Sequence, residues 1–370
     1  MKILILCGSL EPGRDGVGDY VRTLADQLGR DGACRVSAMA IRDAFTYAEV
    51  REQTPAGVPL LRIPAAWNPE RRLERALQYT REYRPDWISI QFVPYSFHPK
   101  GLPVYLVRQL RTLTRDTRVH VMIHETWAGA GYRPGRLLGS WMQKTLLRTM
   151  LDRLGPAVIH THLPEFQEKL GRMNHTARAL PLFSNIPVVA AEPPGCGKLV
   201  IGFFSQVDCS PMILEFLEAL AGRAFSAGLR AELLLIGGQE PRMREFSAFL
   251  RGSRAYRDRV TWTGFLSPAE ISAAIRRCTL GITPVPRHAL GKSGSVAAFL
   301  SHGIPVAAPH ATGDREAGFF SGDLRATILT EPDLEKLKTA RTSLAAVKDE
   351  LRVGEISRRF LHDLKQHSDI

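Results

Sequence analysis

Short runs of hydrophobic residues alternate along this chain with longer segments in which apolar residues recur every three or four positions. The short runs are typical of buried strands, and the longer segments are typical of helices with one apolar face. In the first half, the predicted strands cover residues 2–7, 87–93, 118–124 and 157–162, and the predicted helices cover 18–29, 69–83, 102–113 and 136–153. Strands separated by helices form parallel sheets that are covered on both faces. This half therefore predicts a doubly wound α/β domain.

The alternation stops at the Pro- and Gly-rich stretch 185–197, "NIPVVAAEPPGCG", which we interpret as a linker. It then resumes, with predicted strands over 199–204, 231–237, 259–264 and 280–285 and predicted helices over 211–226, 241–251 and 268–277. Ser267, Pro268 and Glu270 form a capping-box signal for the start of the last helix.

These patterns predict two Rossmann-like domains, an N-terminal one over 1–190 and a C-terminal one over 191–348. The tail, 332–368, reads as charged amphipathic helix. We expect its end, 349–370, to pack back on the N-terminal domain.

Composition is that of a globular protein large enough for two domains, with 370 residues, 44% hydrophobic and 23% charged. No apolar run approaches the roughly 20 residues that span a bilayer. The start, "MKILILCGSLEPG", has a short apolar core and then a glycine-rich loop, which favours a buried strand over a signal peptide. The five scattered cysteines include no C-x-x-C pair, which argues against a disulfide framework or zinc site and favours the reducing cytoplasm.

The net charge of +12 is unevenly spread, since the segment from Lys100 to Arg153 holds ten Lys and Arg against three acidic residues. Such a surface attracts phosphate groups, as in sugar nucleotides, anionic lipid or nucleic acid. A solvated basic face with no partner is the alternative. Because neither an RNA-binding aromatic signature nor zinc-finger spacing is present, we expect no nucleic-acid partner.

The first candidate site is the glycine-rich loop after the first strand. Gly16 and Gly18 would let backbone amides approach a ligand at a helix N-terminus. G-x-G-x-x-G is absent, and we find no acidic residue that closes a second strand at the expected distance, so the loop is no dinucleotide fingerprint. The alternative is a loop that serves geometry alone.

The second candidate is His124-Glu125, at the end of a predicted strand. A histidine and a carboxylate there can orient a reacting group or contact a phosphate. A histidine held by hydrogen bonds in the core is the alternative. Gln91, His160 and His162 also lie at strand ends, and we interpret them as core or rim residues.

The third candidate is the stretch Lys292-Ser293-Gly294-Ser295, which precedes a helix predicted to begin near Ser295. The first amides of a helix are unpaired and carry the positive end of its dipole. Lys292 adds a charge, the serines add hydroxyl groups, and Gly294 lets a diphosphate come close. It is not a P-loop, and the alternative is a plain loop with a lysine facing solvent.

The motifs "GVGDYVRTLADQL", "IHETW", "TGFLSPAEISAAI" and "SHGIPVAAP" resemble the GT-B glycosyltransferases, above all the family 4 enzymes, which retain anomeric configuration. The resemblance covers nearly the whole chain and is most specific from Thr263 to Pro309. It implies a GT-B fold, two Rossmann-like doubly wound domains facing a central cleft.

The resemblance also assigns roles to particular residues. It places Gly16 and Gly18 near the donor phosphates and the transferred sugar, and His124 and Glu125 in the active-site cleft. The further donor-binding residues that it implies are the nucleotide-side residues Ser205, Gln206, Gly264 and Phe265 and the diphosphate loop from Lys292 to Ser295.

Two departures from the family pattern stand out. In register with Gly303-Ile304-Pro305, the two glutamates typical of the family are replaced by Leu290 and Ala298. The usual Arg and Lys after the first strand of the second domain are also missing, and Ser205, Gln206 and Asp208 stand there instead. The loss of the glutamates leaves the stereochemical outcome open.

We therefore expect glycosyl transfer from a UDP- or GDP-sugar, without cofactor or metal, to a glycan, lipid-linked or small-molecule acceptor in cell-surface polysaccharide or glycoconjugate synthesis. Helix 136–153 either lies on an anionic membrane, peripheral to its inner face, or packs on the sheet. The alternatives to a transferase are a catalytically silent sugar-nucleotide-binding or assembly protein of this fold, and an epimerase that needs no acceptor.

Overall fold

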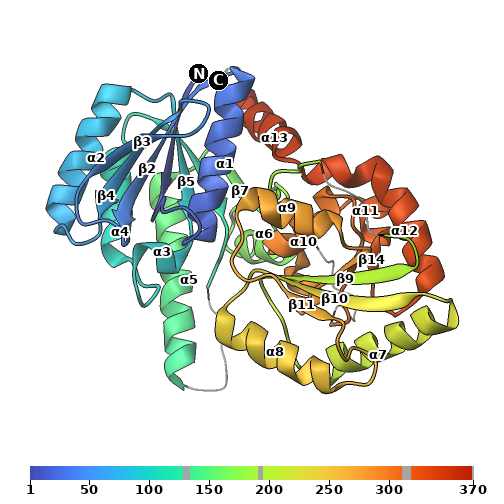
Figure 1. The fold of residues 1–370 in the computed structure, drawn as a ribbon. Coiled ribbons are helices and arrows are strands. Elements are labelled where there is room, and N and C mark those ends of the chain that lie inside the picture. Colours follow the sequence, from blue (N-terminus) through green and yellow to red (C-terminus); the bar gives the residue numbers. More distant parts are fainter. Residues whose placement is uncertain (128–133, 191–194, 311–317, 369–370) are drawn as a thin grey trace. The chain divides into compact units, whose positions relative to one another are not determined.

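The computed structural model of the chain describes residues 1–127, 134–190, 195–310 and 318–368. The chain forms two compact units, each built around its own sheet (Figure 1). The first unit comprises Met1–Leu180 and Ser357–Ile370, and the second comprises Pro181–Ile356.

The first unit contains an eight-stranded sheet in the order β3-β4-β2-β1-β5-β6-β7-β8. Its strands are β1 (Lys2–Cys7), β2 (Arg35–Asp43), β3 (Val50–Gln53), β4 (Pro59–Pro64), β5 (Trp87–Phe92), β6 (Arg118–Ile123), β7 (Val158–Thr161) and β8 (Arg178–Ala179). Only the pairing of β3 with β4 is antiparallel among these strands. Strand order reverses between β1 and β5, and the carboxyl ends of strands at such a point are where open α/β sheets bind ligands.

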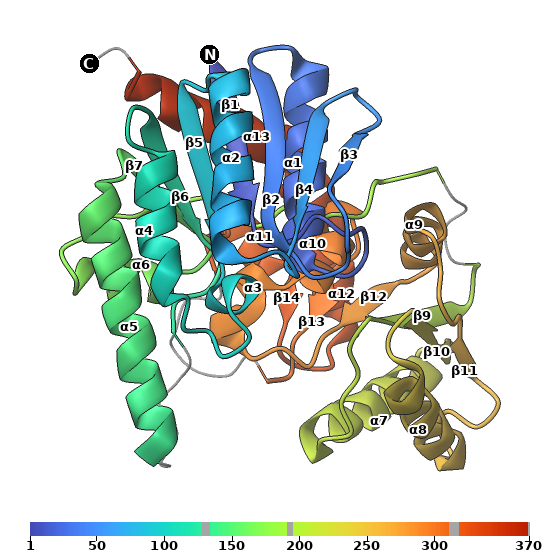
Figure 2. The ribbon, with the colours of Figure 1, turned by 90° about the vertical axis from the view of Figure 1, so that its left-hand side faces the viewer.

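Helices cover both faces of this sheet. They are α1 (Gly16–Asp31), α2 (Pro69–Tyr83), α3 (Pro94–Phe97), α4 (Val104–Leu113), α5 (Pro134–Leu154), α6 (Pro164–Gly171) and, from the end of the chain, α13 (Val353–Gln366). Figure 2 shows α2, α4 and α5 in front of the sheet and α1 and α13 behind it. Hydrogen bonds join α13 and the residue Ser368 after it to strands of the first sheet, from Trp87 Nε1 to Ser368 Oγ at 3.2 Å and from Arg178 Nη1 to Asp363 Oδ1 at 2.8 Å.

The second unit contains a six-stranded parallel sheet in the order β11-β10-β9-β12-β13-β14. Its strands are β9 (Lys198–Phe204), β10 (Arg230–Ile236), β11 (Val260–Trp262), β12 (Leu280–Ile282), β13 (Val306–Ala307) and β14 (Ile328–Leu329). Its helices are α7 (Pro211–Ser226), α8 (Glu240–Gly252), α9 (Pro268–Arg276), α10 (Gly294–Ser301), α11 (Gly322–Ala326) and α12 (Leu334–Val347). Here the strand order reverses between β9 and β12.

The predicted elements are confirmed, with strand ends one to three residues shorter at several places. The capping box is also confirmed: the Ser267 side chain accepts from the Glu270 amide, and the Glu270 side chain accepts from the Ser267 amide. The predicted helical tail is broken by a short 3₁₀ helix, Lys348–Leu351, into α12 and α13. Strands β2 and β4 were not predicted, because small and polar residues interrupt the apolar run of one and prolines bound the other.

Candidate functional site

The glycine-rich loop lies at the reversal point of the first sheet, because it follows β1. A Cβ on Gly8 would lie 2.6 Å from the Cβ of Ser96, and a Cβ on Gly18 would lie 2.7 Å from the carbonyl oxygen of Ser9. Both glycines therefore allow close packing of backbone at this edge. A Cβ on Gly16 would meet nothing within 4 Å, so that position is open.

The chain itself caps the N-terminus of α1. The carboxylate of Asp15 accepts hydrogen bonds from the amides of Val17 at 2.8 Å and Gly18 at 3.2 Å. These amides are the ones that a bound phosphate would use. A negative charge already at this helix end makes the loop better suited to sugar hydroxyl groups than to a diphosphate.

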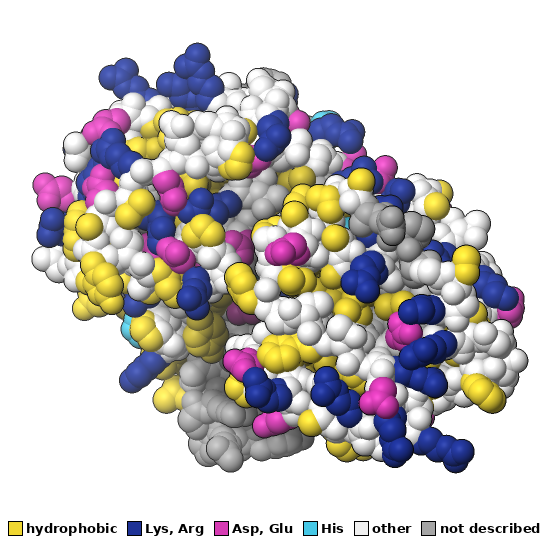
Figure 3. Space-filling view, in the orientation of Figure 1, with side chains coloured by type: hydrophobic (Ala, Val, Ile, Leu, Met, Phe, Trp, Pro, Cys, Tyr) yellow, Lys and Arg dark blue, Asp and Glu magenta, His cyan; other side chains and the backbone are white. Residues whose placement is uncertain are grey.

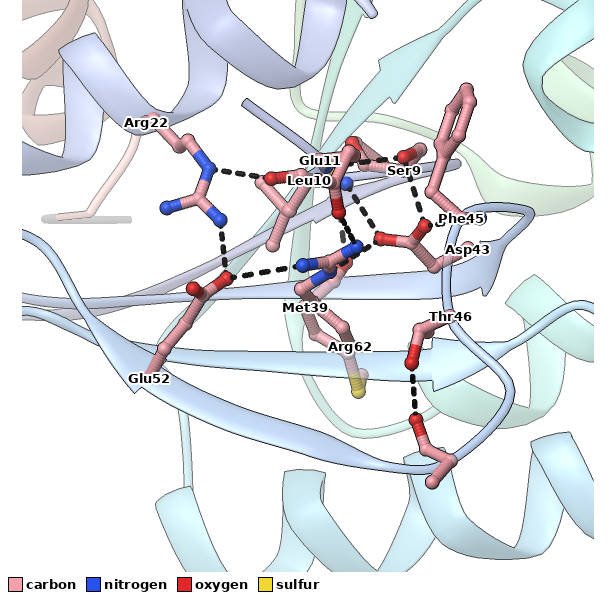
Figure 4. Close-up of polar contacts among 12 residues, drawn as sticks. Ser9, Leu10, Glu11, Arg22, Met39, Asp43, Phe45, Thr46, Glu52 and Arg62 are labelled. Atoms are coloured by element: carbon pink, nitrogen blue, oxygen red, sulfur yellow. Dashed lines mark hydrogen bonds and ion pairs between the residues drawn. The ribbon is translucent and has the colours of Figure 1, made fainter. Parts of the chain in front are cut away.

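A buried acidic residue, Asp43, is hydrogen-bonded to the same loop. Oδ2 of Asp43 accepts from the Leu10 amide at 3.0 Å and from Nε of Arg62 at 2.8 Å, and Oδ1 accepts from Ser9 Oγ at 3.1 Å (Figure 4). Arg62 also pairs with Glu11 of the loop. Although burial opposes it, the hydrogen bonds from Arg62 and the amide of Leu10 lower the pKa of Asp43.

Asp43 corrects one expectation, since an acidic residue does close the second strand. β2 ends at Asp43, and its neighbour β4 carries Arg62. Sequence reasoning missed Asp43 because β2 itself was not predicted. The side chain of Asp43 has no exposed surface and its oxygens are occupied by the chain, so it supports the loop instead of binding a ribose.

His124 follows β6 and is 7% exposed. Its Nε2 lies 2.9 Å from Oε1 of Gln91, and its Nδ1 lies 3.0 Å from Nε2 of His162. The ring of Tyr20, from α1, meets the imidazole edge to face with centroids 4.9 Å apart. Burial lowers the pKa of His124 well below its ordinary value, so the imidazole is neutral.

These contacts match the second interpretation of His124, a histidine satisfied by its neighbours. Gln91 and His162, expected in the core or rim, are the neighbours that satisfy it. Glu125 is partly exposed beside it, at the same end of β6. Thr126 is 2% exposed, and its hydroxyl has no hydrogen-bond partner among the described residues.

In the second unit, the loop after β12 leads into the helix that was predicted to hold a diphosphate. α10 begins at Gly294, one residue before the expected start. Ser293 caps it by accepting from the Val296 amide at 3.4 Å, and Ser293 Oγ lies 3.0 Å from Ser295 Oγ. Lys292 and Gly294 are exposed, and a Cβ on Gly294 would meet nothing within 4 Å.

Two further loops follow β9 and β13, the strands on either side of β12. Ser205 and Gln206 are exposed, and Ser205 has a positive φ of 66°, which is strained for a residue with a side chain. Nε2 of His310 lies 3.0 Å from Ser210 Oγ and 3.3 Å from Oδ2 of Asp208. Sequence reasoning missed His310, because it lies far along the chain from Asp208 and belongs to no motif.

Gly264 and Phe265 follow β11, at the edge of the sheet. Gly264 has a φ of 70°, and Phe265 is 99% exposed. β11 and β12 are three strand spacings apart, roughly 14 Å at about 4.8 Å each. This edge therefore offers an aromatic ring near one end and a cationic helix start near the other.

The two positions that the family pattern gives to glutamate are buried in the hydrophobic core. Leu290 is 1% exposed and Ala298 is fully buried, and both belong to the cluster around α10. Both side chains therefore contribute to the hydrophobic core of the second unit.

Three further features of the described residues concern surface charge, membrane-spanning helices and metal ligands. Figure 3 shows basic side chains interspersed with acidic ones on the face of the second unit that is turned to the viewer. Across the described residues, no helix combines the length and the apolar character that crossing a bilayer requires. Outside the undescribed segments, no three His, Cys, Asp or Glu side chains come together as metal ligands would.

No protein-family model matches the chain, and no curated protein matches its sequence. Solved structures do match its fold. The lipopolysaccharide outer core galactosyltransferase WaaB is 12% identical, with 99% of this chain and 100% of that chain covered and a TM-score of 0.60. The sucrose-phosphate synthase of Thermosynechococcus elongatus is 18% identical over 97% and 93%, with a TM-score of 0.56. The UDP-GlcNAc 2-epimerase of Neisseria meningitidis, bound to UDP-GlcNAc, is 10% identical over 99% and 100%, with a TM-score of 0.54.

These similarities cover nearly the full length of each chain at low sequence identity, and so they concern the fold. In this chain, each of the two units is Rossmann-like, with its strand order reversed at one point. The chain has the GT-B fold, as the resemblance of its motifs implied.

Proposed function

We propose that the protein transfers a glycosyl group from a nucleotide-diphosphate sugar, with the diphosphate held at the start of α10. The observation that carries this proposal is the position of Lys292 and Gly294, exposed at the reversal point of the second sheet. A diphosphate leaving group needs positive charge where its own negative charge develops. Lys292 supplies an ammonium, and the first amides of α10 supply the positive end of a helix dipole.

We propose binding positions for the rest of the donor from the order of the strands. Phe265 offers a ring on which a nucleotide base stacks, beside the turn at Gly264. Ser205 and Gln206 follow the central strand β9, and we propose that they contact the part of the donor between base and diphosphate. A UDP- or GDP-sugar is the donor class that we propose.

In the first unit, we propose that Gly16 and Gly18 lie beside the transferred sugar. The Asp15 carboxylate at the N-terminus of α1 accepts hydrogen bonds, so it suits hydroxyl groups. Of the pair after β6, Glu125 is the proposed catalytic group, because it is partly exposed. His124, with both ring nitrogens hydrogen-bonded, is proposed to position it.

The acceptor is proposed to be a glycan or lipid-linked sugar at an anionic membrane surface. Leu147 and Leu151 of α5 are buried, so this half of the helix packs on the unit. Leu137, Leu138 and Trp141, about two to three turns before Leu147, are 51%, 59% and 63% exposed. We propose that α5 packs on the unit with its buried half and contacts the membrane with its exposed apolar half.

The experiment is an assay of the full chain with UDP-, GDP- and ADP-sugars, with and without a glycan or lipid-linked acceptor. Release of nucleoside diphosphate that depends on acceptor supports the transferase. The similarity to an epimerase solved with its sugar nucleotide motivates the second candidate, and conversion of the sugar without acceptor would favour it. Binding without turnover of any donor would favour a silent sugar-nucleotide binder.

A further inference from the structure

A line of buried polar side chains begins at the last residue of the first unit's long segment. Nδ1 of His162 lies 2.9 Å from the carbonyl oxygen of Leu180, and Nε2 of His162 lies 3.0 Å from Nδ1 of His124. Nε2 of His124 lies 2.9 Å from Oε1 of Gln91, and Nε2 of Gln91 donates to Ser89 Oγ at 2.8 Å. The line thus runs from beyond β7, past the end of β6, into the middle of β5.

The line then turns back across the sheet to the C-terminal helix. Ser89 Oγ lies 2.8 Å from Nδ1 of His120, and Nε2 of His120 lies 3.0 Å from Nδ1 of His160. Nε2 of His160 lies 2.8 Å from Oδ2 of Asp363, on α13. Alternate residues of a strand share a face, which is how these side chains meet on the face that α1 and α13 cover.

Seven contacts make up this line, and each needs one hydrogen atom. A neutral imidazole has one N–H for its two nitrogens, the serine hydroxyl has one hydrogen, and the amide presents one donor edge and one acceptor edge. Four histidines, one glutamine and one serine therefore supply six hydrogens. Both ends, a carbonyl and a carboxylate, only accept. With neutral imidazoles, one contact sets two lone pairs against each other.

We infer that the line holds a seventh proton on His160, against the carboxylate of Asp363, and that this proton fixes His124 as the neutral tautomer with hydrogen on Nδ1. His160 then donates to both Asp363 and His120, and His120 donates to Ser89. The hydroxyl of Ser89 donates to the Gln91 oxygen, and the Gln91 nitrogen donates to Nε2 of His124. His124 donates to His162, and His162 to Leu180.

The orientation of the Gln91 amide depends on which histidine carries the seventh proton. With its oxygen toward His124, the extra proton must lie on His124 or His162. With the amide turned by half a rotation, the proton lies on His120 or His160, and the two amide atoms occupy the same places. Nitrogen and oxygen of an amide are told apart by the hydrogen bonds they make, so the end of the line that holds the extra proton decides between the two orientations.

The charge of Asp363 favours the seventh proton at the end of the line that contacts α13. The Asp363 carboxylate is the negative group that contacts the line, so it favours a proton on His160 next to it, and its ion pair with Arg178 offsets part of that charge. The hydrogen bond from His160 lowers the pKa of Asp363, which keeps the carboxylate ionised. The pKa of His160 is lowered overall, because burial lowers it more than the hydrogen bond and the charge of Asp363 raise it. The seventh proton also gives the line one more hydrogen bond, which, like the Asp363 carboxylate, favours the protonated form of His160.

The charged and titratable groups around the line are few among the described residues. Tyr20 of α1 contacts the rings of His124 and His162, and burial raises its pKa, so it is neutral. Arg178 of β8 and Arg359 of α13 act against a proton on His160. Arg178 also donates to Oδ1 of Asp363 at 2.8 Å, so it stabilises the carboxylate that holds that proton.

Asp363 is therefore a positioning residue for His124, which it reaches through the line and not by contact. The inference concerns protonation and holds whether or not the proposed transfer is correct. The test is long-range ¹H–¹⁵N spectra of the full chain with labelled histidine at neutral pH. We expect a doubly protonated His160 and a neutral His124 with hydrogen on Nδ1. A neutral His160 together with hydrogen on Nε2 of His124 would overturn the inference.

Asp363→Asn and Arg178→Gln form a matched pair, since both alter the contact of α13 with the first unit. In Asp363→Asn the side-chain amide can donate to Nε2 of His160 and supply the seventh hydrogen, so we expect His160 to lose its second proton while His124 keeps its hydrogen on Nδ1. In Arg178→Gln the carboxylate remains, and both signals should stay as in the parent. If His160 keeps its second proton in both variants, or loses it in both, the Asp363 carboxylate does not hold that proton and the inference is wrong.

Discussion

Oδ2 of Asp43 lies 2.8 Å from Nε of Arg62, and both side chains are almost wholly buried at the ends of neighbouring strands. Removing one partner of a buried pair leaves an uncompensated charge, which costs about 3–5 kcal/mol. We expect Asp43→Ala to lower the free energy of unfolding by about that amount in urea denaturation. Glu168→Ala breaks an exposed pair with Arg172 and should change it by about 0.5 kcal/mol or less. Equal small changes would show that Asp43 does not hold the loop.

The two glycines of the candidate sugar site should respond differently to a methyl group. In Gly18→Ala the new Cβ meets the Ser9 carbonyl at 2.7 Å, so we expect a loss of about 1–3 kcal/mol in the free energy of unfolding. In Gly16→Ala the Cβ meets nothing within 4 Å, and stability should stay within about 0.5 kcal/mol of the parent. Thermal denaturation of both variants checks this, and the opposite order would contradict the packing described for the loop.

Acid should destabilise the first unit through its buried histidines. Burial lowers the pKa of His120 and His124 well below 6.5, so the unfolded chain binds more protons than the folded chain below about pH 6.5. Their contribution is fully present above the unfolded pKa and is lost as the pH falls. We expect a loss of up to about 1.4 kcal/mol per histidine for each pH unit below that value.

Urea denaturation between about pH 7.5 and 5.5 measures this slope. His120→Gln should reduce it, whereas His288→Gln, at an exposed position, should leave it unchanged. A free energy of unfolding that rises on acidification would contradict the neutral state of these imidazoles.

The proposed membrane contact of α5 predicts that a charge introduced into its exposed apolar half weakens membrane binding. Trp141→Glu should weaken co-sedimentation with anionic vesicles about tenfold or more, because a buried aromatic contributes about 1.5–3 kcal/mol. Phe225→Glu, on α7 of the second unit and 83% exposed in the parent, is the matched control and should sediment like the parent. Equal binding by all three proteins would rule out this helix as the contact, and equal binding to neutral vesicles would contradict the proposed anionic surface.

Sequence reasoning reached the architecture because long apolar periods and capping signals are local. It found the loops at both reversal points for the same reason. It missed β2, and with it Asp43, because the residues of that strand gain their burial only from neighbours far along the chain. The line from His162 to Asp363 was beyond reach, since it joins three strands with a helix almost two hundred residues later.

The side chain of His124 illustrates the same limit. A histidine at a strand end reads equally as a catalytic group or a core residue. Only the positions of Gln91 and His162 show that both of its nitrogens are engaged. The sequence likewise named Lys292 and Phe265 but not His310, which meets Asp208 through the fold alone.

The most direct test is calorimetric titration of UDP and GDP into the parent, Lys292→Ala and Lys338→Ala. Lys338 is an exposed lysine of α12 paired with Glu335, so it controls for the loss of one positive charge. A close unit charge is worth about 1–4 kcal/mol, so Lys292→Ala should bind the preferred nucleotide about tenfold or more weakly, at an unchanged melting temperature. Lys338→Ala should bind like the parent. Parental affinity in Lys292→Ala would contradict a diphosphate site at the start of α10.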